Sequence, residues 1–207
     1  MKILISVIVI FIIWSLWGYF SSRVEQAEYS VIEKNKEYEI REYSPHIVAQ
    51  TKVSGDYDKA LNEGFSIIAG YIFGGNTQKE SIAMTAPVKE VENKSEKIAM
   101  TAPVTASIEG ETRTISFVMP KKYTLETLPT PNDFRVELVQ VPTTTMAVIR
   151  FSWFRNSGRV DKMKEKLMSV LERDGIETVG EIYYAGYNAP WTPPWMNRNE
   201  VLIEIKK

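Results

Sequence analysis

Cysteine and histidine, which most often do nucleophilic, redox and proton-transfer chemistry, are scarce in this chain of 207 residues. There is no cysteine, and His46 is the only histidine. The lack of cysteine excludes disulfides, iron–sulfur clusters, thiolate zinc sites and cysteine nucleophiles. A single histidine nearly excludes a nucleophile–base pair, and the sequence has no phosphate-binding loop, no HExxH motif and no carboxylate pair at a suggestive spacing. We therefore expect no catalytic residues, no metal site and no enzyme.

The few residues that could coordinate a metal ion have simpler interpretations. Met84, Met100 and Met119 offer thioether sulfurs to a soft metal. Methionine more often fills irregular hydrophobic cores, and we favour core packing for all three. His46 follows the Ser44-Pro45 turn, where a surface histidine is favoured over a ligand.

Composition narrows the class of protein. Apolar residues make up 44% of the chain and charged residues 25%, which is typical of a folded globular protein. The length suits one domain with a sizeable core. The formal net charge is −1 and there is no block of like charge, so we expect no nucleic-acid partner.

The N-terminus predicts a membrane partner. Residues 3–20 are apolar except for two serines and a glycine, and as a helix they would extend about 27 Å, enough to cross the hydrocarbon core of a bilayer. A cleaved signal peptide is the alternative, but its apolar region is usually shorter, about 7–15 residues. No Ala-x-Ala site follows here, and Trp14 and Trp17 resemble interfacial anchors. A buried helix is the third interpretation.

The chain is therefore divided into a membrane anchor (or signal peptide) with its linker, residues 1–28, and a soluble domain, residues 29–207. Lys2 precedes the apolar segment, whereas Arg23 and two acidic residues follow it. The positive-inside rule then leaves the N-terminus in the cytoplasm. We expect a single-pass membrane protein whose domain is extracytoplasmic, or secreted if the segment is cleaved.

A seven-residue sequence, IAMTAPV, occurs at residues 82–88 and again at 98–104, with a charged stretch between the copies. The spacing predicts two antiparallel strands joined by a long hairpin loop. Pro87 and Pro103 would lie at strand ends or bulges, because proline cannot donate to a ladder. The repeat contains no titratable group, so we interpret it as structural.

Two helices are predicted at corresponding places in the two halves of the domain. Apolar residues recur at steps of three and four within residues 56–73, with Asp56 as N-cap and the Gly74-Gly75-Asn76 sequence as a stop. The same period returns over residues 160–171, with Gly175 as C-cap. Strands are expected at residues 38–43, 46–53, 112–119, 134–141, 145–154, 182–187 and 200–205. This order predicts an internally duplicated α+β domain, with its strands in one curved sheet or open barrel.

Several stretches together are similar to the SOUL haem-binding protein family. In chain order they are YEIREY (38–43), YIFGGN (71–76), IAMTAPV, FVMPKKY (117–123), LPTPND (128–133), AVIRF (147–151), YNAP (187–190) and RNEV (198–201). The resemblance implies a distorted antiparallel β-barrel with two helices, built from two pseudo-symmetric βαββ-like halves. It also implies that haem or another tetrapyrrole binds in an apolar groove.

The resemblance places this groove against the first helix. The face formed by Phe65, Ile68, Ala69 and Ile72 matches the stretch that lines the groove in family members, although packing in the core is the alternative for each of these residues. Family members carry basic residues on this helix to meet the haem propionates, whereas this chain has Asn62 and Gly70. A histidine proposed as a ligand in some members is replaced here by Glu42, so we expect weak or no iron ligation.

The loop at residues 188–197 completes the expected cofactor site. Proline keeps this loop extended, and we expect Trp191 and Trp195 to form a flap over the groove; covering the open end of the fold is the alternative. Arg198 could bind a propionate as a bidentate donor or pair with Glu200.

These expectations combine into one function. The protein is predicted to be a membrane-anchored binding protein for haem or another planar hydrophobic ligand. The ligand would be held without catalysis between helix 56–73 and the loop at residues 188–197, called the Trp loop below. Binding would come mostly from burial of apolar surface. The alternative is a protein- or lipid-interaction module that uses the same concave face.

Overall fold

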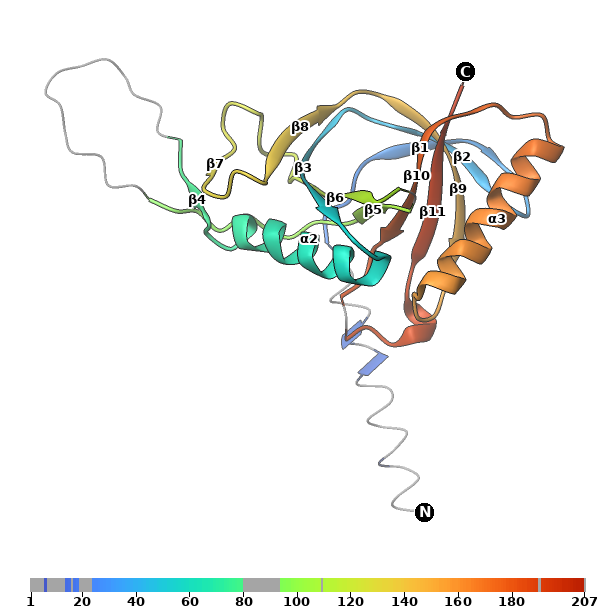
Figure 1. The fold of residues 1–207 in the computed structure, drawn as a ribbon, viewed down its shortest axis with the longest axis horizontal. Helices are drawn as coiled ribbons and strands as arrows, with labels where there is room; N and C mark the ends of the chain where they lie inside the picture. Colours follow the sequence, from blue (N-terminus) through green and yellow to red (C-terminus); the bar gives the residue numbers. More distant parts are fainter. Residues whose placement is uncertain are drawn as a thin grey trace, which may run out of the picture.

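The computed structural model describes residues 6, 14, 15, 17, 18, 24–79, 94–108, 110–189 and 191–206. Within them, two helices lie against a strongly curled sheet (Figure 1). The helices are α2 (Tyr57–Ile72) and α3 (Ser157–Arg173), and a short 3-10 helix, η1 (Pro194–Met196), precedes the last strand. The strands are β1 (Tyr29–Lys34), β2 (Glu39–Tyr43), β3 (His46–Ser54), β4 (Asn76–Thr77), β5 (Val104–Ser107), β6 (Thr112–Val118), β7 (Thr130–Pro131), β8 (Glu137–Val141), β9 (Thr144–Phe151), β10 (Thr178–Gly186) and β11 (Asn199–Ile205).

Short connections force the main sheet to curl. Its order is β1-β2-β9-β11-β10-β5-β6-β3-β8, with all pairs antiparallel. β2 and β3 lie six places apart in this order, yet only Ser44 and Pro45 join them, and β8 and β9 are equally far apart and equally closely joined. Six strand spacings of a flat sheet measure about 29 Å, whereas such a connection reaches about 11 Å. The expected barrel is therefore an open half-barrel.

The sheet order has an internal two-fold symmetry. Followed inward from one side it runs β2-β9-β11-β10, and from the other side β8-β3-β6-β5. The first strand of each half pairs with a strand of the other half: β2 pairs with β9, and β8 pairs with β3. Each half is thus ββαββ, one strand more than the predicted βαββ unit, and the halves meet between β5 and β10.

Alternating residues of the strands serve two hydrophobic cores. Ala49 and Ile203 belong to the larger core beneath the helices, whereas their neighbours Val48 and Leu202 belong to a smaller core on the other face. α2 lies on β3 and β6, and α3 lies on β9, β10 and β11. The period-two pattern of the strands thus gives each face of the sheet its own hydrophobic core.

The first predicted helix is confirmed as α2. The Asp56 side chain accepts a hydrogen bond from the Lys59 amide at 3.1 Å and caps the N-terminus. Gly64 allows a close approach to β6, because a Cβ atom there would lie 2.7 Å from the side chain of Ile115. After the helix, Gly74 has a φ of 119°, in the region that favours glycine. The close packing of α2 on β6 thus depends on Gly64, and the turn that ends the helix depends on Gly74.

The second predicted helix is confirmed as α3, with similar signals. Asn156 is the N-cap, and its side chain accepts from the Arg159 amide at 2.9 Å. The buried stripe includes Val160 and Leu171, and Gly175, with a φ of 70°, follows the last turn. The helical period in the sequence therefore located both helices correctly.

The prediction that the two IAMTAPV copies pair as strands is wrong for the second copy, and the first copy lies outside the described residues. In the second copy, the Ile98 amide donates to the Ile72 carbonyl and the Ala102 amide donates to the Glu25 carbonyl, each at 2.9 Å. These bonds direct residues 98–103 to the end of α2 and to the N-terminal linker. Only Val104 of the copy is in a strand, β5, whose two neighbours are β6 and β10. Pro103 does lie at a strand end, as predicted.

One further strand prediction is corrected, and one strand was missed. The strand expected at 134–141 begins only at Glu137, and Phe134, the first residue of the expected strand, is 94% exposed. β1 was not predicted, because its exposed sequence, YSVIEK, lacks a clean alternation of apolar and polar residues. An edge strand packs on one neighbour and so carries a weaker pattern.

No helix in the described part of the chain is long and apolar enough to cross a membrane. The predicted anchor at residues 3–20 lies mostly outside the described residues. Of the residues in this range that are described, Ser6, Trp14, Ser15, Trp17 and Gly18 are helical. Trp14 and Gly18 contact the loop at residues 188–197.

Candidate ligand-binding groove

A groove of about 300 Å³ lies on the helix side of the sheet, where the two halves of the domain meet. Its floor is the end of the central strand pair, at which Val104 of β5 is paired with Gly186 of β10. One half supplies Leu61, Asn62, Phe65 and Val104, and the other supplies Phe154, Arg155, Tyr184, Gly186, Asn188, Ala189, Asn197 and Asn199. A ligand in this groove would therefore contact both halves.

Two aromatic side chains form the apolar walls of the groove. Phe65, on α2, packs against Phe117 with ring centroids 5.2 Å apart, and 37% of Phe65 remains exposed. On the opposite side Phe154 is 63% exposed. Such rings can cover the face of a planar ligand by offset or edge contacts. The walls thus suit a flat, apolar molecule.

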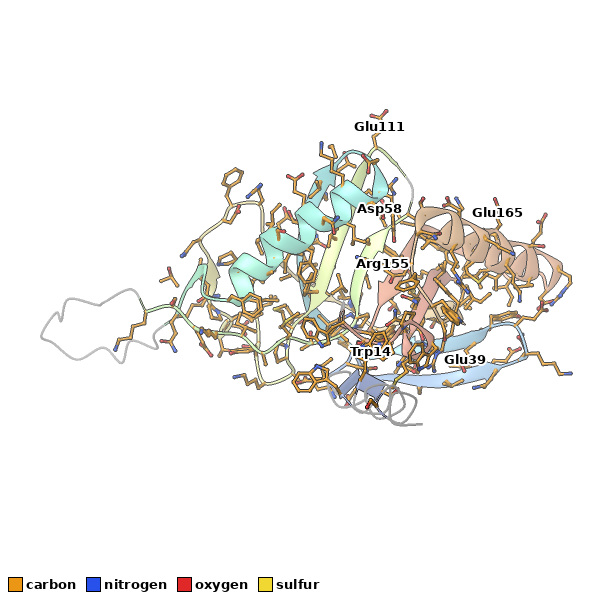
Figure 2. The ribbon with its side chains drawn as sticks, turned by 90° about the horizontal axis from the view of Figure 1, so that it is seen from below. Trp14, Glu39, Asp58, Glu111, Arg155 and Glu165 are labelled. Carbon is orange, nitrogen blue, oxygen red and sulfur yellow. The ribbon has the colours of Figure 1, made fainter. Side chains whose placement is uncertain are left out.

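Polar groups line the rest of the groove. The Tyr184 hydroxyl donates to Asn199 Oδ1 at 2.6 Å, and Asn199 Nδ2 donates to the Trp153 carbonyl at 3.0 Å. Burial raises the pKa of Tyr184 to about 12, so this phenol is neutral at physiological pH. Arg155 lies 5.9 Å from the centre of the Tyr184 ring and between the two helices in Figure 2. Its guanidinium is the cation that a carboxylate of a bound ligand would meet.

The structure separates the predicted helix residues. Phe65 lines the groove. Ile68 and Ile72 are 0% and 1% exposed and belong to the core beneath α2, and Ala69 is half-buried. The spacing of four residues between Phe65 and Ala69 predicted a shared face, but only the first turns of α2 reach the groove.

Arg198 is not among the residues that line the groove. Its Nε donates to Glu200 Oε1 at 2.9 Å and one Nη donates to Gln26 at 3.0 Å. The guanidinium also lies 3.8 Å from the centre of the Tyr187 ring. The structure thus shows the predicted alternative, a structural pair with Glu200.

The Trp loop contacts the N-terminal segment. The Trp195 ring meets the Trp14 ring edge-on, with centroids 5.4 Å apart, and Trp14 Nε1 donates to the Trp191 carbonyl at 3.0 Å. Neither Trp191 nor Trp195 is among the residues that line the groove. The stem of this loop, at Asn188 and Asn197, does line it.

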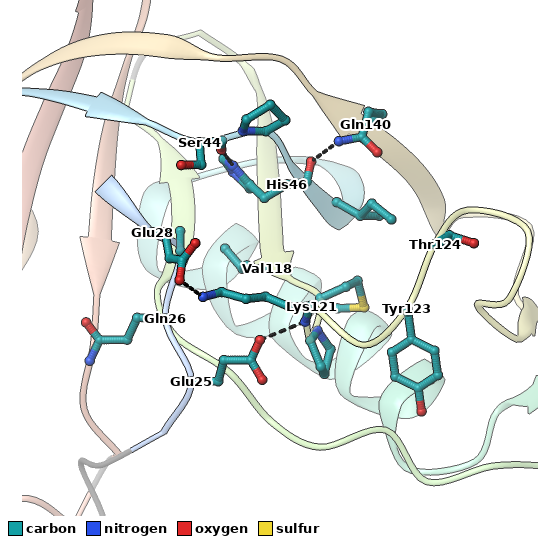
Figure 3. Close-up of a pocket in the computed structure, with 15 residues that line it drawn as sticks. Glu25, Gln26, Glu28, Ser44, His46, Val118, Lys121, Tyr123, Thr124 and Gln140 are labelled. Carbon is teal, nitrogen blue, oxygen red and sulfur yellow. Dashed lines mark hydrogen bonds and ion pairs between the residues drawn. The ribbon is translucent and has the colours of Figure 1, made fainter. Parts of the chain in front are cut away.

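A second cavity, of about 340 Å³, contains His46 and Met119 (Figure 3). Its charged groups are paired: Lys121 forms an ion pair with Glu28, and the Lys121 amide donates to Glu25 at 2.7 Å. His46 Nδ1 lies 2.8 Å from the Ser44 carbonyl. These contacts tie the N-terminal linker to the segment that follows β6. Apolar side chains, among them Ile47, Val118 and Met119, also line this cavity.

A third cavity, of about 230 Å³, lies inside the curl of the sheet. Tyr43 of β2 and Val141 of β8 both line it, although these strands lie at nearly opposite ends of the sheet order. Its wall is largely apolar, with Val48 and Leu202 on the floor and His46 at the edge. It is the alternative location for a hydrophobic ligand.

The groove between the halves could hold a tetrapyrrole ring but offers its iron no strong ligand. Its lining residues include no histidine, cysteine or methionine, and Tyr184, the only phenol among them, already donates to Asn199. No cluster of potential metal ligands occurs among the described residues. Of the methionines, Met119 is 3% exposed and packs in the core as predicted, whereas Met100 is 41% exposed, and Met84 lies outside the described residues.

Sequence reasoning missed most of the groove. Phe154 was assigned to the end of the strand predicted at 145–154, whereas β9 ends at Phe151. Arg155 was not considered, and Tyr184 was assigned only to a strand. A signal was present in the asparagines at 188, 197 and 199, because asparagine side chains organise loops by bonding to backbone groups. Their convergence depends on the register of β10 and β11, which sequence does not reveal.

The curled antiparallel sheet with one helix in each duplicated half places the chain among two-fold duplicated α+β domains. Among solved structures, the EcmrR C-terminal domain matches with a TM-score of 0.59 at 12% identity, covering 86% of this chain and 98% of that one. A hydrolase from Listeria innocua matches with a TM-score of 0.52 at 11% identity, covering 84% and 94%. At such identities the likeness concerns the fold alone.

Sequence comparison gives the family. The model of the SOUL heme-binding protein family matches residues 24–93 and 89–204. Heme-binding protein 2 of Homo sapiens is 31% identical over 172 residues, which cover 82% of this chain and 78% of the relative. Heme-binding protein 1 of Xenopus laevis is 26% identical over 184 residues, covering 86% and 90%. The chain belongs to the SOUL haem-binding protein family, which supports haem as its ligand and a binding role rather than an enzymatic one.

Proposed function

We propose that this protein binds haem or another planar tetrapyrrole in the groove between its two halves, without catalysis, and that residues 3–20 anchor it to a membrane. The observation that carries the binding proposal is the pair of partly exposed rings, Phe65 and Phe154, which face one cavity from different halves of the domain. Family membership supports the choice of ligand.

The size of the groove determines how the ligand is held. About 300 Å³ is at the lower end of the range for small-molecule pockets, about 300–1,000 Å³, so one edge of a tetrapyrrole stays outside. Each 100 Å² of apolar surface removed from water contributes about 2.5 kcal/mol, against a cost of association of about 4–15 kcal/mol. Partial burial of the ring therefore gives moderate affinity and permits release.

Arg155 and the asparagines give the site its polarity. Arg155 is exposed at the mouth of the groove, where its guanidinium can meet a propionate without being desolvated. Bound haem would supply redox-active iron, but the lining residues present no imidazole or sulfur to it. The chain's own contribution is to cover the ring and to pair its carboxylates.

The anchoring proposal is supported by the sequence alone. Residues 3–20 are long and apolar enough to span a bilayer, and the charges beside them favour a cytoplasmic N-terminus. The domain is then extracytoplasmic and held within reach of the membrane surface. Release by cleavage of the segment would show as a mature N-terminus beyond residue 20 in intact-protein mass spectrometry.

A haemin titration of the full chain in lipid nanodiscs tests the binding proposal. We expect a saturable shift of the Soret band relative to empty nanodiscs, and Phe65→Ala should weaken binding by about tenfold, or about 1.4 kcal/mol. Phe73→Ala is the matched control, because Phe73 is the C-cap residue of α2, is 57% exposed and is not among the groove residues. Equal weakening by both substitutions, or no saturable shift, would reject the site or the ligand.

Iron-free protoporphyrin IX separates ring burial from iron ligation. Because the groove lacks an iron ligand, haemin and protoporphyrin should bind with affinities within about tenfold of each other, or about 1.4 kcal/mol. A much stronger preference for haemin would require an iron ligand outside this groove, and His46 in the cavity inside the curl would be the first residue to test.

A further inference from the structure

All five tryptophans of the chain occur at one end of the domain. Their exposed fractions are large: 42% for Trp14, 66% for Trp17, 50% for Trp153, 58% for Trp191 and 37% for Trp195. In Figure 2, Trp14 lies where the N-terminal segment meets the domain. Concentration of exposed large apolar side chains on one face marks an interaction surface.

The Trp loop contacts the apolar segment itself and not the linker after it. Trp14 donates to the Trp191 carbonyl and its ring meets Trp195. One turn further along, a Cβ atom on Gly18 would lie 2.5 Å from Pro193 Cδ, so the loop and the helix backbone touch there. Both contact positions lie within the apolar stretch of residues 3–20. Whatever medium surrounds this turn of the segment must therefore also surround the loop.

A second loop extends this face toward the groove. The Trp153 amide donates to the Pro194 carbonyl at 2.9 Å, and Asn197 Nδ2 donates to the Trp153 carbonyl at 3.5 Å. Trp153 is followed by Phe154, which is exposed and lines the groove. The aromatic face and the groove mouth are thus parts of one continuous surface.

We propose that this surface, formed by Trp14, Trp17, Trp153, Phe154, Trp191 and Trp195, lies in the interfacial layer of a lipid bilayer, so that the groove opens toward the lipid. The inference rests on the proposed anchoring of residues 3–20. It differs from the expected flap, because it assigns the exposed tryptophans to lipid and not to the ligand.

The chemistry of the side chains selects a bilayer over a protein partner. Tryptophan combines a large apolar ring with one donor and is enriched where hydrocarbon meets water. Here the face is continuous with a segment whose length and composition suit a bilayer. A partner protein would have to cover the same loop while excluding the lipid that surrounds the adjacent helix.

Site-directed labels test this placement in the full chain. Because the protein has no cysteine, Trp17→Cys, Trp191→Cys, Trp153→Cys and Phe134→Cys each create a unique site for a fluorophore. The labelled chains are reconstituted in nanodiscs containing nitroxide lipids. Trp191 contributes its main-chain carbonyl to the bond with Trp14, so the side-chain change leaves that contact in place. Phe134, 94% exposed and outside the tryptophan face, is the control.

We expect strong lipid quenching at positions 17, 191 and 153, and little at 134. Quenching at 17 but not at 191 or 153 would keep the anchor and reject the membrane-facing surface. Absence of quenching at 17 would reject both. Haemin titration of the same samples reports ligand binding separately, so failure of the ligand proposal is distinguishable from failure of this one. Equal quenching at 134 would show non-specific adsorption and also contradict the proposal.

Discussion

Arg41 Nη1 donates to Glu200 Oε2 at 2.9 Å, and both side chains are almost completely buried, with 3% and 0% exposed. The Tyr187 hydroxyl and Arg198 Nε donate to the same carboxylate at 2.8 and 2.9 Å. Burial is the largest single effect and opposes the charge of Arg41, but the hydrogen bonds and charge attraction from Glu200 and Tyr43 together outweigh it and raise the pKa of the guanidinium. One carboxylate therefore joins β2, β11 and, through Arg198, the N-terminal linker.

Removal of this carboxylate charge should destabilise the domain. Glu200→Gln removes the buried counter-charge shared by Arg41 and Arg198, and Arg41 keeps only its pair with Glu39. Loss of one partner of a buried pair typically costs about 3–5 kcal/mol. At about 2–4 °C per kcal/mol for a domain of this size, thermal denaturation followed by circular dichroism should show a large fall in Tm. Asp133→Asn is the control, since it breaks an exposed pair with Arg135 that contributes little. Similar Tm values for the two variants would contradict the role given to Glu200.

Arg155→Gln should weaken haem binding through loss of a contact with a propionate. The Arg155 side chain is exposed, so we expect the haem affinity to fall by about two- to fivefold, within the range of about 0.2–1 kcal/mol for exposed ion pairs. The difference should shrink in high salt and vanish with haem dimethyl ester, which lacks the carboxylates. Arg159→Gln, on the first turn of α3 and outside the groove lining, should bind like the parent chain. Persistence of the Arg155 effect with the ester would show a steric cause.

His46→Ala should leave the haemin titration unchanged. His46 borders the cavity that contains Lys121 and the cavity inside the curl, and it is not among the residues of the proposed groove. Absorption spectra of the ferric complex would reveal any change in axial ligation. Loss of binding or a changed spectrum in this variant would move the site to the cavity inside the curl.

Buried tyrosines should make the protein sensitive to alkali. Burial raises the pKa of Tyr57, Tyr184 and Tyr187, to about 12 for Tyr184. A raised pKa means that the native state keeps these protons where the unfolded chain loses them. Their contribution to stability is complete below the unfolded pKa of about 10 and is lost as pH rises through the folded values. Circular dichroism and tyrosinate absorbance should therefore change together above about pH 10.

Tyr57→Phe provides the matched variant for the alkaline transition. The Tyr57 hydroxyl is buried without a hydrogen-bond partner among the described residues, so its removal loses no bond and should leave the protein as stable at neutral pH or more stable by about 1 kcal/mol. The variant should also withstand alkali better, because one buried phenol no longer ionises. A clear loss of stability at neutral pH would indicate an unrecognised partner for the hydroxyl.

Sequence patterns located the elements far better than the site. The helical period and the caps Asp56 and Gly175 fixed both helices, because these signals are local. Phe65 was found for the same reason. Ile68 and Ile72 share its stripe, yet which part of a stripe meets a groove depends on where the other half of the sheet ends.

The strand exchange and the repeat show where local patterns lose their information. Nothing in the sequence of β2 distinguishes pairing with β3 from pairing with β9, since both partners offer the same alternation. The IAMTAPV repeat suggested a pair of strands, but tertiary hydrogen bonds from Ile98 and Ala102 override that pattern. Arg198 could be assigned only as one of two alternatives, because its partner Glu200 is near in sequence while Gln26 is 172 positions away.

The exchange of first strands has a consequence for the order in which the protein is made. The ribosome completes β2 and β3 long before β9 and β8, their partners across the halves, exist. The first half therefore emerges with two unsatisfied strand edges, which attract other chains, and cannot close until synthesis is nearly finished. Tethering by an N-terminal segment would hold each nascent domain apart from its neighbours during this interval.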